Sequence, residues 1–179
     1  MSSRRLVVDA SVAGAAGSSQ HPTSKSNRDF LREVWKVCHK VVMPPEISEE
    51  WKEHSSKFTL GWRKSMVAAR KLLAVPSVPN AALRRRINRF RFTPRQRRAV
   101  EKDAPLVEAA LAADRIVISR DAEARALFSA LAPDWPPLFN VVWLQPDASP
   151  GEALEWLRRG ARPVRKWQLG PRGSRRNTE

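Results

Sequence analysis

The chain has 179 residues, of which 42% are hydrophobic, and a formal net charge of +15 at pH 7. This length suits one domain with a buried core, and the absence of any run of about 18 apolar residues argues against a membrane span. A single cysteine, Cys38, excludes a disulfide within the chain and favours a cytoplasmic protein. The excess positive charge favours a polyanionic partner, and nucleic acid is the leading one.

A short apolar strand that ends in an acid is predicted at residues 6–9, within Arg5-Leu6-Val7-Val8-Asp9-Ala10-Ser11. Residues 10–24 are small and polar, which predicts a loop and the start of a helix. They contain two glycines, but neither G-x-G-x-x-G nor the lysine of a phosphate loop, so nucleotide binding is disfavoured. A helix is predicted from Ser26, its cap, to Lys40.

The second predicted strand covers residues 41–43 and is stopped by two prolines. A long amphipathic helical stretch then runs from Ile47 to the residues before Pro76, and Gly61 is a point where it could divide. Its acids follow the second strand closely, so they are candidates for a site at the strand ends.

A basic segment is predicted at residues 80–99, with two interleaved phenylalanines and no acid among its arginines. Thr93-Pro94-Arg95-Gln96 has the pattern of a capping box, so a helix is predicted to begin at Pro94. This density of positive charge predicts phosphate contacts, and a solvated helix face is the competing interpretation. The candidate nucleic-acid-binding residues are Arg84, Arg85, Arg86, Arg89, Arg91, Arg95, Arg97 and Arg98.

The stretch from Asp103 to Asp121 predicts a helix, a tight connection and a buried strand that is followed by an acid. Asp103 is predicted as the helix N-cap, with Pro105 in the first turn. Residues 116–118 are β-branched, as in a strand buried on both faces, and Asp121 follows its carboxyl end, where ligands bind in open α/β sheets. Because the helix runs antiparallel to that strand, Asp103 and Asp121 are predicted to meet.

The rest of the chain predicts a helix at 122–132, a strand at 139–144 and a helix through Arg159 that Gly160 ends. Alternating strands and helices predict an α/β fold, a three-layer α/β/α sandwich around a mainly parallel sheet. The first strand and the strand at 115–119 should be neighbours. One domain is predicted over residues 1–160, with the basic segment as a helical insert and residues 161–179 as a basic, flexible tail.

Three features together resemble the PIN-domain family of nucleases. They are Val-Val-Asp-Ala-Ser at residues 7–11, an acid in the helix after the second strand, and Ala-Asp-Arg-Ile-Val-Ile-Ser-Arg-Asp at 113–121, preceded by Asp103. The resemblance covers roughly residues 5 to 145. It implies a compact α/β/α fold whose clustered carboxylates hold divalent metal ions and cut single-stranded or structured RNA.

The resemblance places four acids in the active site: Asp9, Glu50, Asp103 and Asp121. Clustered carboxylates suit Mg²⁺ or Mn²⁺, which take oxygen ligands and assist phosphodiester hydrolysis. Glu46, Glu49 and Glu53 are rivals of Glu50, because one sequence does not fix the helix register. Ser11 and Ser119 are candidate polar neighbours that orient a water or a phosphate. Asp114 is either an outer ligand or a turn residue.

The sequence therefore predicts a metal-dependent endoribonuclease, either the toxin of a toxin–antitoxin pair or a free-standing RNA-processing enzyme. RNA is the favoured partner, an antitoxin or a second copy of the chain is a further one, and no membrane partner is predicted. The competing interpretation is a non-catalytic nucleic-acid-binding or interaction module on a similar scaffold. The histidines lack zinc spacing and no G-x-S-x-G motif is present, so other catalytic sites are disfavoured.

Overall fold

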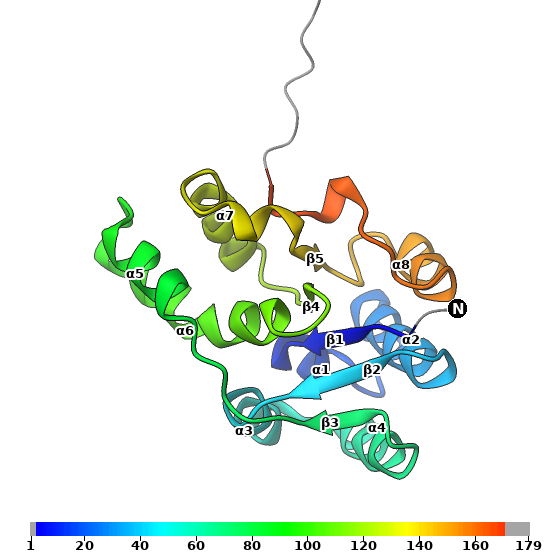
Figure 1. The fold of residues 1–179 in the computed structure, drawn as a ribbon. Helices are drawn as coiled ribbons and strands as arrows, with labels where there is room; N and C mark the ends of the chain where they lie inside the picture. Colours follow the sequence, from blue (N-terminus) through cyan, green and yellow to red (C-terminus); the bar gives the residue numbers. More distant parts are fainter. Residues whose placement is uncertain (1–2, 171–179) are drawn as a thin grey trace, which may run out of the picture.

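Five short strands form the centre of the fold (Figure 1). The computed structural model describes residues 3–170, and within them the strands are β1 (Arg5–Val8), β2 (Lys40–Met43), β3 (Leu72–Ala74), β4 (Ile116–Ile118) and β5 (Val142–Leu144). Their order in the sheet is β3-β2-β1-β4-β5, and every neighbouring pair is parallel. The predicted parallel α/β sheet is confirmed, and so is the pairing of the first strand with the strand at 116–118.

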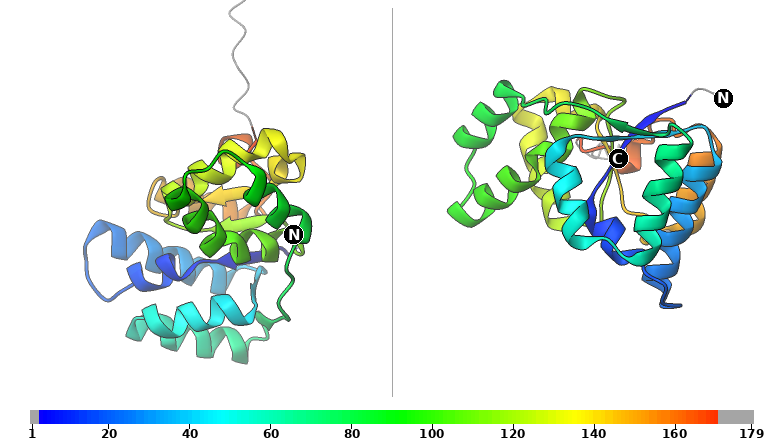
Figure 2. Two further views of the ribbon diagram at one scale, coloured as in Figure 1. Left: turned by 90° about the vertical axis from the view of Figure 1, so that its left-hand side faces the viewer. Right: turned by 90° about the horizontal axis from the view of Figure 1, so that it is seen from below.

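Helices cover both faces of this sheet, which makes three layers (Figure 2). In the described residues they are α1 (Ala10–Ala15), α2 (Pro22–Lys36), α3 (Pro45–His54), α4 (Lys57–Ala68), α5 (Ala81–Arg89), α6 (Pro94–Leu111), α7 (Ala122–Leu131) and α8 (Pro150–Arg158). The first four pack with α8, whereas α5, α6 and α7 pack together on the opposite face. The α/β/α sandwich follows from this arrangement, because parallel strands need crossovers that place helices on the sheet faces.

The central strands are apolar because both of their faces are covered. Leu6, Val7 and Val8 of β1 are fully buried, as are Val117 and Ile118 of β4. This explains why both strands read as continuous apolar runs rather than alternating ones. The edge strand β3 is only partly buried, and its short sequence was predicted as the end of a helix.

One long helix replaces the two that the sequence predicted between Pro94 and Asp114. The capping box at Thr93 and Gln96 is present, but α6 continues to Leu111 with Pro105 inside it. Asp103 therefore lies within the helix, and its prediction as an N-cap is wrong. The helix continues because Val100, Ala104 and Val107 form one buried face, whose burial outweighs the hydrogen bond that a proline removes.

Two further helix boundaries differ from the predicted ones. His21 caps α2 by accepting a hydrogen bond from the Thr23 amide, so the helix begins before Ser26. Ser56 caps α4 through the Thr59 amide, so the amphipathic stretch divides there and Gly61 lies inside a helix. In both cases a side-chain cap next to the break satisfies amides that the helix itself cannot.

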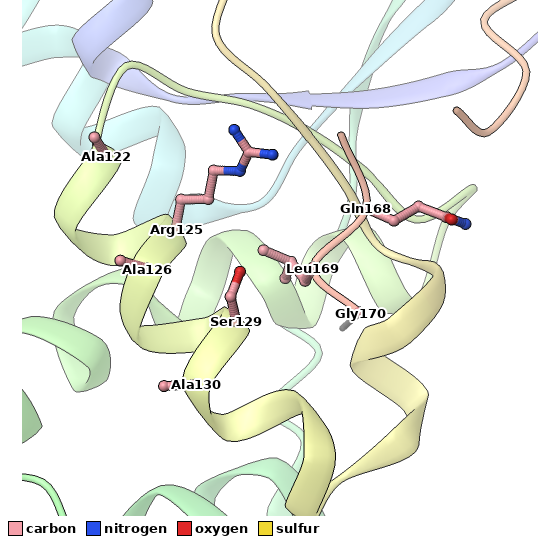
Figure 3. A pocket seen from close by; sticks show the side chains of 8 residues that line it. All are labelled: Ala122, Arg125, Ala126, Ser129, Ala130, Gln168, Leu169 and Gly170. Atoms are coloured by element: carbon pink, nitrogen blue, oxygen red, sulfur yellow. The ribbon is translucent and has the colours of Figure 1, made fainter. Parts of the chain in front are cut away.

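Residues 161–170, predicted as part of a flexible tail, make specific contacts with the sheet and with α8. The Leu169 side chain is fully buried and its amide donates to the Val141 carbonyl. Gln168 and Gly170 lie beside α7 and border a cavity of about 540 Å³ (Figure 3). The remainder of the predicted tail, residues 171–179, lies outside the described residues.

The predicted basic insert consists of α5 and the first turns of α6, which stand away from the sheet in Figure 1. Two of its arginines hold this helical pair together. Arg84 forms a bidentate ion pair with Glu108, a carboxylate that is 5% exposed, and Arg97 donates to the carbonyls of Ile87 and Phe90 at the end of α5. Both were predicted to bind nucleic acid, but their guanidinium groups already have partners within the protein.

In the described part of the chain, no helix is long and apolar enough to cross a membrane. This agrees with the absence of such a run in the sequence.

Arg84→Gln should destabilise the fold by about 1–3 kcal/mol, because it leaves the buried Glu108 carboxylate without its charged partner. Urea denaturation would measure the change in the free energy of unfolding. Arg85→Gln is the matched control, since the neighbouring Arg85 is exposed, and it should change stability by less than about 0.5 kcal/mol. Equal effects of the two substitutions would show that the ion pair with Glu108 does not hold α5 in place.

Candidate active site

A cleft of about 310 Å³ lies at the carboxyl edge of β1 and β4. The four predicted acids all line it, together with residues of α1 and the turn before α7. The lining residues include Asp9, Ser11, Gly14, Glu50, His54, Lys102, Asp103, Arg120 and Asp121. The strands bring these groups together because parallel neighbours end at the same edge of a sheet.

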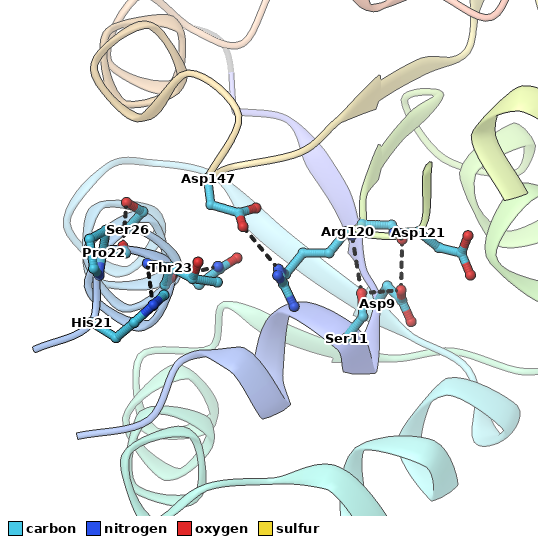
Figure 4. A network of polar contacts seen from close by, with 11 residues as sticks. Asp9, Ser11, His21, Pro22, Thr23, Ser26, Arg120, Asp121 and Asp147 are labelled. Atoms are coloured by element: carbon cyan, nitrogen blue, oxygen red, sulfur yellow. Dashed lines mark hydrogen bonds and ion pairs between the residues drawn. The ribbon is translucent and has the colours of Figure 1, made fainter. Parts of the chain in front are cut away.

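Asp9 is at the floor of the cleft, directly after β1. Its amide donates to the Ile118 carbonyl at 2.9 Å, which fixes the ends of the two strands side by side. Two hydroxyls donate to the same carboxylate oxygen, Oδ2. One is that of Ser11 (Figure 4), and the other is that of Ser119. The Asp9 carboxylate is therefore held in one orientation. Both predicted serine neighbours contact it, and their role in orienting a water or a phosphate stays a prediction.

Asp121 and Asp103 reach the cleft from different elements. Asp121 is the N-cap of α7, where its Oδ1 accepts a hydrogen bond of 2.7 Å from the Ala124 amide. Asp103 projects from the middle of α6, which crosses the sheet beside β1 and β4. Although Asp103 does not cap a helix, its predicted meeting with Asp121 is confirmed by their shared cleft.

Glu50 is the acid of α3 that lines the cleft, whereas Glu46, Glu49 and Glu53 are exposed and absent from its lining. The reason is the neighbouring Trp51, whose fully buried indole donates to the Val8 carbonyl at 2.8 Å. This bond attaches α3 to the end of β1 and thereby turns Glu50 towards Asp9.

Collecting these carboxylates in one cleft changes their ionisation. Burial, followed by the charges of Asp121 and Asp9, raises the pKa of Asp103 from 3.8 to about 7. Burial and the charge of Asp9 also raise the pKa of Glu50. Lys102 opposes both shifts from the rim of the cleft. The site thus disfavours full ionisation, as expected for partly buried like charges held close together.

The donor set suits a hard divalent cation, because it consists of carboxylate oxygens, and their mutual repulsion would be relieved by positive charge. Among residues 3–170, however, no three acidic, histidine or cysteine side chains already stand as ligands of one ion. Binding would therefore require the carboxylates to turn towards a common point in the cleft.

Asp114 lies away from the site, so its prediction as an outer ligand is wrong. Its Oδ2 accepts from the backbone amide of Arg5 at 2.7 Å and pairs with the Arg5 guanidinium. Arg5 begins β1, whereas Asp9 follows its end, so Asp114 is at the opposite edge of the sheet. Asp114 acts as a turn residue that ties α6 to the first strand.

The predicted nucleic-acid-binding arginines separate into two groups. Arg84 and Arg97 have internal partners in the helical pair. The other six are exposed on α5, on the connection to α6 and on the first two turns of α6: Arg85, Arg86, Arg89, Arg91, Arg95 and Arg98. These remain available to a polyanion.

Sequence reasoning missed three ionisable residues of the cleft. His54 follows Glu50 by one helical turn, a spacing that could have identified it once Glu50 was chosen. Lys102 and Arg120 are sequence neighbours of Asp103 and Asp121. Their adjacency to predicted acids was a signal, but a charged neighbour in sequence lies on the same surface only when the local backbone allows it.

The larger cavity beside α7 has no such chemistry. Its lining consists of small, apolar and neutral polar residues, with Arg125 as the ionisable group that borders it (Figure 3). Because reactive groups and not volume define an active site, we assign the candidate site to the smaller cleft.

Comparison of the sequence with protein-family models gives no match, and a search of curated proteins also gives none. The resemblance to PIN-domain nucleases therefore stays a prediction from the sequence.

Asp103→Asn should stabilise the metal-free protein at pH 8. A carboxyl with a pKa of about 7 when folded and 3.8 when unfolded binds more protons in the folded state, so stability falls as pH rises between those values. The side chain of asparagine does not ionise, so the substitution removes this loss of stability. After discounting for partial exposure, we expect a gain on the order of 1–2 kcal/mol, or roughly 3–6 °C in Tm, measured in EDTA. The gain should shrink as pH falls from 7 towards 4.

Asp114→Asn is the control for this experiment. Burial acts to raise the pKa of Asp114, but hydrogen bonds from Arg5 outweigh it and the net pKa is lowered. This substitution should therefore give no gain in stability at pH 8. If Asp103→Asn behaved in the same way, the carboxylates of the cleft would not be in mutual repulsion.

Proposed function

We propose that the protein is a metal-dependent endoribonuclease of the PIN type, with the acidic cleft as its active site. The observation that carries the proposal is the convergence of Asp9, Glu50, Asp103 and Asp121, from four separate elements, on one cleft. Like charges are gathered at a cost to stability, which favours a functional reason for their presence. The net charge of +15 supports an anionic polymer as substrate.

Each residue has a role in this proposal. The four carboxylates hold Mg²⁺ or Mn²⁺, and the serines at Asp9 keep one of its oxygens occupied so that the other faces the ligand. When bound, the metal supplies an activated water and neutralises charge on the phosphate. Hydrolysis then joins the water oxygen to phosphorus and breaks one ester bond, and the leaving ribose oxygen takes up a proton.

The exposed arginines of α5 and α6 hold the RNA backbone. Arg98 and Lys102 are one turn apart on α6, and Lys102 lines the cleft. A strand bound along this helix would thus pass from the exposed arginines into the active site. Such phosphate contacts set affinity and register rather than base specificity.

The non-catalytic alternative, a binding module on the same scaffold, does not account for the cleft. A module that only binds RNA gains nothing from carboxylates that repel each other and the phosphates. The nuclease proposal does not depend on the protein being a toxin or on an antitoxin partner.

Asp9→Asn should abolish cleavage of labelled RNA in Mg²⁺ or Mn²⁺, by at least about 10²-fold, while the fold is kept. The amide has nearly the same volume but lacks the charge that a metal ligand needs. RNA binding should persist, because a negative charge near the phosphate is removed. Cleavage on a gel and affinity by fluorescence anisotropy would measure the two effects.

Glu49→Gln and Asp114→Asn are the matched controls, since both acids lie outside the cleft. They should retain activity within about threefold of the parent. Full activity of Asp9→Asn under the same conditions would refute the assignment of the acidic cleft as the active site.

Replacement of Arg85, Arg86 and Arg89 by Gln should weaken RNA binding similarly across sequences. If each arginine binds one phosphate of a single strand, the triple replacement should lower the slope of log affinity against log salt by about 2. The rate at saturating RNA should change little, because the acids are untouched. The control replaces three exposed cations of α2, Lys25, Arg32 and Lys36, which changes the net charge equally. An equal loss of affinity in both triple variants would mean that net charge alone governs binding.

A further inference from the structure

Arg120 is an arginine of the cleft that the acidic cluster does not require. It lies in the turn between β4 and α7 and is one of the residues that line the cleft, and its side chain is 32% exposed. Its amide donates to the Ser11 hydroxyl, which in turn donates to the Asp9 carboxylate (Figure 4). The backbone of Arg120 is thus fixed to the most buried acid of the site.

The guanidinium of Arg120 is held at one end. Its Nε donates at 3.2 Å to Oδ2 of Asp147, in the loop after β5, and that carboxylate is 10% exposed. The other oxygen of Asp147 is buried and has no hydrogen-bond partner among residues 3–170. An acid with this little access to water, and with one oxygen unused, is well suited to orienting an arginine and poorly suited to contacting solvent.

The two terminal nitrogens of Arg120 make no hydrogen bond within residues 3–170, and they are not among the buried unpaired atoms. Figure 4 shows the side chain extending from the turn beside Ser11 and Asp9 towards Asp147, which the guanidinium contacts. An arginine fixed through Nε presents its remaining donors as a planar fork, and such a fork matches two oxygens of a phosphate.

We propose that Arg120 binds the non-bridging oxygens of the scissile phosphate and that Asp147 is the positioning residue that holds its guanidinium. This inference rests on the proposed nuclease function and identifies the ligand of Arg120 as a phosphodiester of the RNA strand. Arg120 differs in this role from the arginines of α5 and α6, because it acts on the phosphate that reacts. It stabilises the charge that develops there during hydrolysis.

The test uses two measurements on the full-length protein. Binding of a labelled RNA oligonucleotide is measured by anisotropy in the Asp9→Asn background, where cleavage does not interfere. There, Arg120→Gln should weaken affinity about fivefold to tenfold and lower the salt slope by about 0.7, the value for one phosphate contact. In the otherwise unchanged protein it should lower kcat about 10²-fold, and Arg120→Lys should restore part of kcat.

Asp147→Asn separates positioning from a structural role. It keeps the charge of Arg120, so the salt slope should stay the same, but kcat should fall about tenfold because the fork is no longer held. If the ion pair were only structural, both variants would lower Tm and neither would change kcat well below Tm. That result would overturn the proposal.

The ion pair between Arg5 and Asp114 at the opposite edge of the sheet is the matched control. Arg5→Gln should leave the salt slope and kcat unchanged, and a loss equal to that of Arg120→Gln would overturn the inference.

The RNA-binding measurement distinguishes failure of this inference from failure of the proposed nuclease function. RNA binding that depends on Arg120 without any cleavage by the parent would overturn the nuclease function and leave the phosphate contact standing. Cleavage that is unaffected by Arg120→Gln would overturn the proposed phosphate contact and leave the nuclease function standing.

Discussion

The parallel pairing of β1 with β4 is the constraint on which the candidate site depends. Val8 is in register with Ile118, and the Asp9 amide continues the ladder to the Ile118 carbonyl. The chain leaves both strands at the same edge, so two acids more than a hundred residues apart in sequence share one cleft. Both also begin a helix, α1 after Asp9 and α7 after Asp121, which gives the carboxylates fixed backbone positions.

The cost of this arrangement is electrostatic. Asp103 and Glu50 enter a partly buried cleft that already contains acids, and the pKa of each is raised. The apolar core on both faces of the sheet supplies the stability that tolerates the repulsion. Lys102 and Arg120 place positive charge at the same cleft, and Asp147, an acid from outside the cleft, anchors Arg120. The cleft therefore combines groups suited to a cation with one suited to an anion.

A basic sequence does not by itself define a binding surface. Arg84 and Arg97 belong to the same run as the exposed arginines, yet they join α5 to α6 through Glu108 and through carbonyls at the end of α5. Their contribution is to hold the helical pair rigid, which keeps the exposed arginines in a fixed position relative to the cleft. Rigid presentation of charge lowers the entropy lost when a polymer binds.

The sequence by itself determined the features that depend on neighbours in the chain. Apolar runs located β1 and β4, the capping box located the start of α6, and the acids after the strands identified Asp9 and Asp121.

Tertiary structure decided what depends on contacts between distant elements. Glu50 was selected over its rivals by the bond from Trp51 to the Val8 carbonyl, and α6 continues past Asp103 because its apolar face is buried. Residues 161–170 contact three separate elements, β5, α7 and α8. Periodicity shows which side of a helix is apolar, but it does not show which element packs against that side. The partner of an apolar face or of an arginine lies elsewhere in the chain, so the free energy of that contact is not encoded in the local sequence.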